Sequence, residues 1–280
     1  MRHTPSRPKI GTMARFVEMD IERRKSMDRT WLIAFMVLCG ILAGCGGKKE
    51  VPAAGSEVRP GPPARIGGSG KILCRVRFEG DAPKPTLIRM DADKRCLALH
   101  PTTARSQEAL VSDQHMLQNV FVYVKEGVPP GRYPTPGAPV VVEQAGCMYS
   151  PRVFGIRVGQ TLQITNADPT LHNIHVLPLL NEQFNVAQPK QGMRTERSFA
   201  KPEIMIRVKC DVHSWMSAYI GVLDHPFFAV TDAKGACEIR NLPPGDYVLA
   251  AWHEKFGERT TNVSVRDSTT VAVSFSFAPR

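Results

Sequence analysis

Short runs in which apolar and polar residues alternate recur along the chain from about residue 70 to its end. They include residues 71–78, 119–124, 153–158, 204–210, 259–265 and 270–277. Alternation with a period of two is typical of strands with one buried face, and Gly, Pro, Asn and Asp residues separate the runs. We therefore predict an all-β body. Residues 80–118 lack this period, so a long covering loop with at most a short helix near residues 92–99 is expected there.

A different pattern occupies residues 1–44. Basic residues between Arg23 and Arg29 precede the apolar run 31–42, which is too short to span a bilayer and is typical of a signal peptide. The run ends in Leu-Ala-Gly-Cys45, which resembles a bacterial lipobox. That resemblance implies that Cys45 is acylated and becomes the first residue of the exported protein. A small-residue cleavage site with an incidental cysteine is the alternative.

Residues 45–69 are rich in Gly, Pro, Ala and charged residues and have no hydrophobic period. This composition predicts a flexible tether between the lipid and the body. Gly46 follows Cys45 where an acidic residue, by resemblance to lipoprotein sorting rules, would favour the inner membrane. We therefore expect a lipid-anchored protein on the periplasmic side of the outer membrane or at the cell surface.

The segment with the clearest chemistry is Cys-Asp-Val-His-Ser-Trp-Met at residues 210–216. It places a thiolate, an imidazole and a thioether three residues apart, directly after an alternating run. A soft thiolate with imidazole selects copper, and a weak axial thioether is typical of blue-copper sites. A degenerate relative of such a protein without metal is the alternative. A blue-copper site also requires a second histidine from elsewhere in the chain.

His172 and His175 compete for that position. Alternation along His-Asn-Ile-His-Val puts His172 on the face of Ile174 and Val176, and turns His175 the other way. His172 is therefore predicted to point inward. The same test places Cys210 on an inward face with Ile204, Ile206 and Val208.

These residues resemble the cupredoxins, which are Greek-key sandwiches with type 1 copper. The resemblance covers about residues 140–224, and its loop spacing is most similar to that of amicyanin. It implies one type 1 copper ion and gives Asn173 the role of tying the two ligand loops together. The implied ligands are His172, Cys210, His213 and Met216. Asp211 and Trp215 depart from the family pattern, which leaves the tuning of the site open.

The last part of the chain predicts a second, smaller sandwich. Residues 227–252 contain strands and a Pro-Pro-Gly-Asp-Tyr turn, and resemble the transthyretin-type carboxypeptidase regulatory-like domain. Residues 226–280 are too few for seven strands, so the missing ones are expected in residues 70–138. In that layout the cupredoxin domain, residues 139–225, is inserted into the second sandwich. Two sandwiches in series are the alternative.

Four cysteines remain beside Cys39, Cys45 and Cys210. An even number in an oxidising compartment suggests disulfides, and three pairings are possible. We favour Cys96 with Cys147 and Cys74 with Cys237, with four free thiols as the alternative.

The formal net charge of the chain is +10, which suits binding to acidic partners or membrane surfaces. The sequence has no basic cluster interleaved with aromatic residues, so we do not expect it to bind nucleic acid.

A copper ion with four protein ligands leaves no position open for a substrate, so single-electron transfer is expected and enzymatic activity is not. The family resemblance implies that electrons leave through an exposed edge of His213. The expected partners are redox proteins, for example a periplasmic dehydrogenase or cytochrome. Copper storage, and binding of a glycan or protein by the second sandwich, are the alternatives. His225 and His253 are expected to be ordinary hydrogen-bonded histidines rather than a second metal site.

Overall fold

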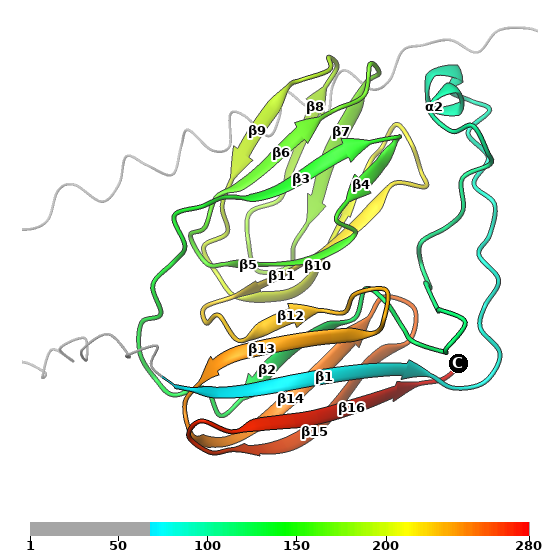
Figure 1. Cartoon of the computed structure of the whole chain (residues 1–280). Helices are drawn as coiled ribbons and strands as arrows, with labels where there is room; N and C mark the ends of the chain where they lie inside the picture. Colours follow the sequence, from blue (N-terminus) through cyan, green and yellow to red (C-terminus); the bar gives the residue numbers. More distant parts are fainter. Residues whose placement is uncertain (1–67, 280) are drawn as a thin grey trace, which may run out of the picture. The chain divides into compact units, whose positions relative to one another are not determined.

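A computed structural model describes residues 68–279, and nearly all of them belong to strands or the loops between them (Figure 1). The predicted all-β class is confirmed. The predicted signal peptide at residues 1–44, the lipidation site Cys45 and almost all of the tether at residues 45–69 lie outside the described residues. Among the described residues, no helix has the length and apolar character that crossing a membrane requires.

Strands from both ends of the described chain build one sandwich, which we call the split sandwich. Its two sheets have the strand orders β13-β1-β16 and β12-β2-β14-β15. Strand β1 runs parallel to β16 and antiparallel to β13. The strands are β1 (Gly70–Phe78), β2 (Phe121–Glu126), β12 (Phe228–Val230), β13 (Ala236–Leu242), β14 (Gly245–His253), β15 (Gly257–Val265) and β16 (Thr270–Phe277).

The strands between β2 and β12 form a second sandwich, which we call the ligand sandwich. Its sheets have the orders β5-β11-β10-β7-β8 and β4-β3-β6-β9, and it has its own apolar core. The strands are β3 (Val140–Ala145), β4 (Met148–Ser150), β5 (Val153–Arg157), β6 (Leu162–Asn166), β7 (His172–Leu177), β8 (Phe184–Gln188), β9 (Arg194–Arg197), β10 (Glu203–Lys209) and β11 (Ser217–Leu223).

Two paired glycines let the sandwiches approach each other closely. Gly155 of β5 lies opposite Gly221 of β11, and a Cβ atom at these positions would lie 2.2 Å from the Phe228 ring and 2.4 Å from the Phe121 ring, respectively. The absence of side chains therefore makes room for the aromatic rings of β2 and β12. A buried ion pair joins the same region, because Arg152 Nη2 donates to Glu254 Oε2 over 2.7 Å.

The segment between β1 and β2 leaves the split sandwich, passes the ligand sandwich and returns (Figure 1). It contains the short helix α2 (Lys94–Ala98), which begins after the N-cap residue Asp93. The helix lies within the region where the sequence allowed at most a short helix. The single buried residue of the helix is Cys96, and Met90, just before the helix, is buried in the core of the ligand sandwich.

His225 and His253 are buried in or beside the split sandwich. His225 Nδ1 accepts the backbone N–H of Phe227 at 3.2 Å, and His253 Nδ1 accepts that of Lys255 at 3.2 Å. Both are thus ordinary hydrogen-bonded histidines. Burial lowers the pKa of each imidazole to about 4, and the positive charges of Arg157 near His225 and Arg152 near His253 act in the same direction, although Asp224 opposes the shift at His225.

These two pKa values predict that stability falls as the pH drops from about 6.5 to about 4. In that pH window the unfolded state takes up protons at both imidazoles and the folded state does not. Each histidine therefore lowers the free energy of unfolding by on the order of 3 kcal/mol. We expect His225→Asn with His253→Asn, which keeps a hydrogen-bond acceptor, to flatten the pH dependence of the free energy of unfolding in urea. The exposed His115→Asn is the control. An unchanged slope in the double variant would contradict this account.

Candidate metal centre

The predicted ligands lie at neighbouring strand ends of one sheet. His172 is the first residue of β7, Cys210 follows β10, and Met216 precedes β11. Strand β10 pairs with both β7 and β11, so the three ends meet at one edge. Alternation along the strands points the buried side chains of His172 and Cys210 into the same core.

Three donor atoms converge at this edge. His172 Nδ1 and His213 Nδ1 are 3.0 Å apart, and Cys210 Sγ lies 3.9 Å from His213 Nδ1. All three lie within 4.8 Å of one another. Bonds of about 2.0 Å to nitrogen and 2.3 Å to sulfur are typical for first-row metal ions, so one ion can reach all three atoms. A thiolate with two imidazoles is a donor set that suits copper.

Met216 is wholly buried in the core of the ligand sandwich. Backbone hydrogen bonds close the loop that carries it: Cys210 N–H donates to the Met216 carbonyl at 3.2 Å, and Met216 N–H donates to the His213 carbonyl at 3.0 Å. The loop therefore has a tight, regular backbone that holds the thiolate, imidazole and thioether residues together.

The side chains of His172 and His175 point to opposite faces of β7, as the alternation along the strand predicts. His172 is fully buried beside Ile174 and Val176, whereas His175 lies on the other face, where Nδ1 approaches Asp211 Oδ2 at 2.9 Å. The expected inward position of Ile204 is wrong. A bulge between Glu203 and Ile206, with Met205 at a φ of 58°, turns Ile204 outward, and it is 37% exposed.

Asn173 connects the first histidine to the loop. Its Oδ1 accepts the backbone N–H of Asp211 at 2.7 Å and lies 3.2 Å from Cys210 Sγ. Its Nδ2 donates to Asp211 Oδ2 at 3.1 Å. Asp211, which departs from the family pattern, thus braces this link on the surface. Hydrogen bonds from Lys209, Asn185 and His175 lower the pKa of Asp211.

Two carboxylates that the sequence analysis missed face the outer nitrogens of the imidazoles. His172 Nε2 lies 2.9 Å from Asp168 Oδ2, and His213 Nε2 lies 3.1 Å from Asp93 Oδ2. Asp168 stands four residues before His172, which is a signal that could have been noticed. Asp93 is far from His213 in sequence, and only the path of the α2 segment brings them together.

The expected exposed edge of His213 is not found. His213 is 2% exposed, because Asp93 and the Cys96–Cys147 disulfide cover its outer nitrogen, with Cys96 Sγ 3.4 Å from Nε2. Trp215 packs beside it, with ring centroids 5.1 Å apart, and its Nε1 donates to the Cys147 carbonyl at 3.0 Å. The indole therefore anchors the loop to the core.

Cys74 and Cys237 do not form the expected disulfide, since both are free cysteines in the structure. They do lie directly opposite each other in the antiparallel pair of β1 and β13. The strand register therefore places the two cysteines side by side, although no bond joins them. Cys210 is also free, as a thiolate ligand must be.

The surroundings favour a thiolate at Cys210. Burial raises the pKa of Cys210, but hydrogen bonds with His172, Asn173 and His213 outweigh it and lower the pKa. At His172 burial acts to lower the pKa of the imidazole, but hydrogen bonds with Asp168 and Cys210 outweigh burial and raise the pKa to about 9. For His213 burial prevails over the Asp93 hydrogen bond, and its pKa is lowered.

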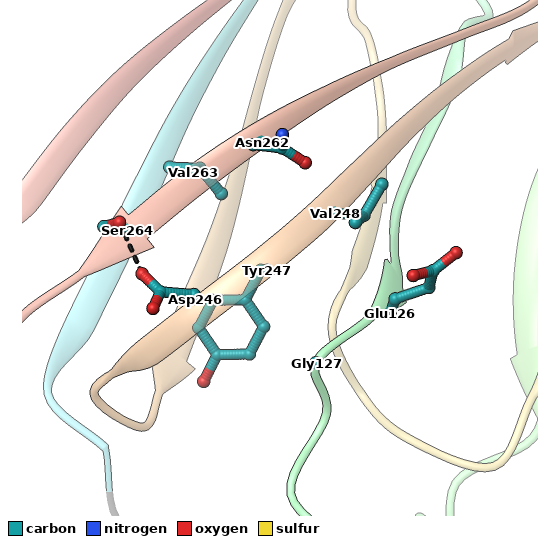
Figure 2. A pocket seen from close by; sticks show the side chains of 8 residues that line it. All are labelled: Glu126, Gly127, Asp246, Tyr247, Val248, Asn262, Val263 and Ser264. Atoms are coloured by element: carbon teal, nitrogen blue, oxygen red, sulfur yellow. Dashed lines mark hydrogen bonds between the residues drawn. The ribbon is translucent and has the colours of Figure 1, made fainter.

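A separate cleft of about 510 Å³ lies in the split sandwich and shares no residue with the metal centre. Glu126, Asp246 and Asn262 contribute polar groups to it, and Asp246 accepts a hydrogen bond from Ser264 (Figure 2). Its one aromatic lining residue, Tyr247, is buried, and the Tyr247 hydroxyl donates to the Pro243 carbonyl at 2.6 Å. The cleft thus presents no open aromatic face to a ligand, and does not favour the glycan-binding alternative.

No family model and no curated relative matches the sequence, but solved structures match part of it. A copper-containing nitrite reductase from Thermus scotoductus is 26% identical over 35% of this chain and 25% of its own, with a TM-score of 0.29. A purple cupredoxin from Nitrosopumilus maritimus is 26% identical over 29% of this chain and 97% of its own, with a TM-score of 0.25. A Cu(I) amicyanin variant is 17% identical over 36% and 97%, with a TM-score of 0.28.

The expectation that this chain is not an enzyme is corrected by these comparisons, because the matched nitrite reductase is an enzyme. The chain spans a quarter of that reductase's length. A closed set of four ligands restricts the chemistry at one ion and does not restrict the rest of the protein.

The two histidines of β7 provide a direct test of the centre. We expect His172→Gly to lower copper affinity by more than the roughly 10- to 100-fold that loss of an outer partner costs, because it removes a donor atom. His175→Gly, on the opposite face of the same strand, should bind copper like the unaltered protein. Competition with a chelator measures both affinities. Equal losses in the two variants would contradict the assignment.

Proposed function

We propose that this chain is an exported mononuclear type 1 copper protein that carries single electrons between redox partners. The observation that supports this most is the convergence of His172 Nδ1, His213 Nδ1 and Cys210 Sγ within 4.8 Å in a buried pocket. Met216 would supply the axial thioether. Copper bound there would supply a one-electron couple between Cu(I) and Cu(II).

The protein's own contribution is to hold the donors in a fixed arrangement. Asn173 pins the Cys210 loop to β7, and the core buries the ligand side chains, so the geometry cannot relax freely when the charge of the ion changes. Burial also excludes water. A rigid, dry donor set lowers the reorganisation that accompanies electron transfer.

Export and anchoring are part of the proposal. The Leu-Ala-Gly-Cys45 motif supports lipid attachment, and the Cys96–Cys147 disulfide suits an oxidising compartment. The second sandwich is proposed to be of the carboxypeptidase regulatory-like type, since Tyr247 bonds back to Pro243 at its corner. A diacylglyceryl group on Cys45 in the intact mass of the exported protein would support the anchoring, and an unmodified Cys45 would contradict it.

The type 1 site is tested by the visible and electron-spin spectra of the copper-loaded body, residues 68–280. We expect a strong thiolate-to-copper charge-transfer band, which Cys210→Ser abolishes because serine offers no thiolate. Cys237→Ser, which alters a free cysteine of the split sandwich, is the matched control and should leave the band unchanged. A colourless copper-loaded protein would contradict the proposal.

Copper storage is the competing function, and electron self-exchange distinguishes the two. A carrier should be reduced and reoxidised reversibly, and mixtures of its Cu(I) and Cu(II) forms should show rapid exchange in nuclear magnetic resonance line widths. A storage site needs neither property. Slow exchange together with reversible copper release would favour storage.

A further inference from the structure

Both imidazoles of the metal centre have a carboxylate at their outer nitrogen, and the two carboxylates have different origins. Asp168 comes from the same loop as His172. Asp93 comes from the N-cap of α2, in the segment that joins β1 to β2 of the split sandwich, and lies 120 residues before His213. A part of the chain outside the ligand sandwich therefore touches a candidate copper ligand.

The geometry of Asp93 suits a specific role. A histidine that binds a metal through Nδ1 keeps its proton on Nε2 and donates it outward. A carboxylate that accepts this hydrogen bond makes the imidazole a stronger donor to the ion, and its negative charge stabilises Cu(II) relative to Cu(I). Both effects lower the reduction potential.

Asp93 is held in place from several sides. Its Oδ1 accepts the backbone N–H groups of Arg95 at 2.8 Å and Cys96 at 3.4 Å, which is N-cap geometry. Thr170 Oγ1 donates to Oδ2 at 3.1 Å. These hydrogen bonds fix the orientation of the Asp93 side chain toward His213.

The Cys96–Cys147 disulfide joins the helix that Asp93 caps to the turn between β3 and β4, and that turn is hydrogen-bonded to Asp168. Cys96 lies in the helix that Asp93 caps, while Cys147 N–H donates to Asp168 Oδ2 at 2.7 Å. The helix buries no other residue. After the helix, a hydrogen bond joins His100 Nε2 to the Gly146 carbonyl at 2.7 Å.

We propose that Asp93 is a positioning residue that binds the outer nitrogen of His213 and lowers the reduction potential of the copper site, and that the Cys96–Cys147 disulfide keeps it there. This inference rests on the proposed type 1 site. Asp93 acts through His213 and does not itself contact the ion. The α2 segment is therefore part of the metal centre, although it belongs to neither sheet of the ligand sandwich.

The test is the reduction potential of the copper-loaded full-length protein, measured by spectroelectrochemistry. Asp93→Asn keeps a cap and a hydrogen-bond acceptor but removes the charge. We expect its equilibrium constant for reduction to rise about tenfold, which is a shift of about 59 mV for one electron, while the charge-transfer band persists. Asp91→Asn is the matched control, because Asp91 lies on the same segment and pairs with Arg89 at the exposed surface. Equal potentials in both variants and the unaltered protein would overturn the proposal.

The role of the disulfide is tested in a second background. In Cys96→Ser with Cys147→Ser, the shift caused by Asp93→Asn should shrink, because Asp93 is no longer held at His213. An undiminished shift would overturn this part. Thr170→Val, which removes a hydrogen bond to Asp93 and leaves the disulfide intact, should raise the potential in the same direction and serves if the serine variant does not fold. A missing charge-transfer band in the unaltered protein is a distinct result that would contradict the proposed function itself.

Discussion

The arrangement of the candidate metal centre depends on a hydrogen-bonded link between two chain segments, in which Asn173 Oδ1 accepts the backbone N–H of Asp211. The donors come from two chain segments, the start of β7 and the loop after β10, and the strand pairing alone leaves the loop free to tilt. The 2.7 Å link from Asn173 to Asp211, with the same oxygen beside Cys210 Sγ, removes that freedom. This contact sets the position of the Cys210 thiol relative to His172.

The split sandwich imposes a second constraint, since the ligand sandwich begins and ends within its fold. Strands β2 and β12 flank the insertion and pair with each other, so the two ends of the inserted region are brought together. The paired glycines Gly155 and Gly221 then give the rings of Phe121 and Phe228 a flat surface to lie on. A side chain at either glycine would push the sandwiches apart.

The α2 segment, which belongs to the split sandwich by its place in the chain, covers one of the candidate ligands, His213. A cupredoxin-like site is expected to expose the edge of its second histidine, whereas here Asp93, the disulfide and Trp215 enclose it. The burial of His213 thus depends on both sandwiches, because Asp93 and Cys96 lie between strands β1 and β2 of the split sandwich, while Cys147 and Trp215 belong to the ligand sandwich.

The sequence by itself determined the all-β class and pointed to the candidate donor residues. Alternation with a period of two is a local property, so it distinguished His172 from His175 and marked the inward face of Cys210, and it erred at Ile204 because a bulge changes the phase of a strand. Ligand spacing within one loop is also local. Tertiary structure alone decided that Asp93 meets His213 and that Cys74 stays unbonded beside Cys237, since contacts between distant segments depend on how the strands pair and leave no periodic trace in the sequence.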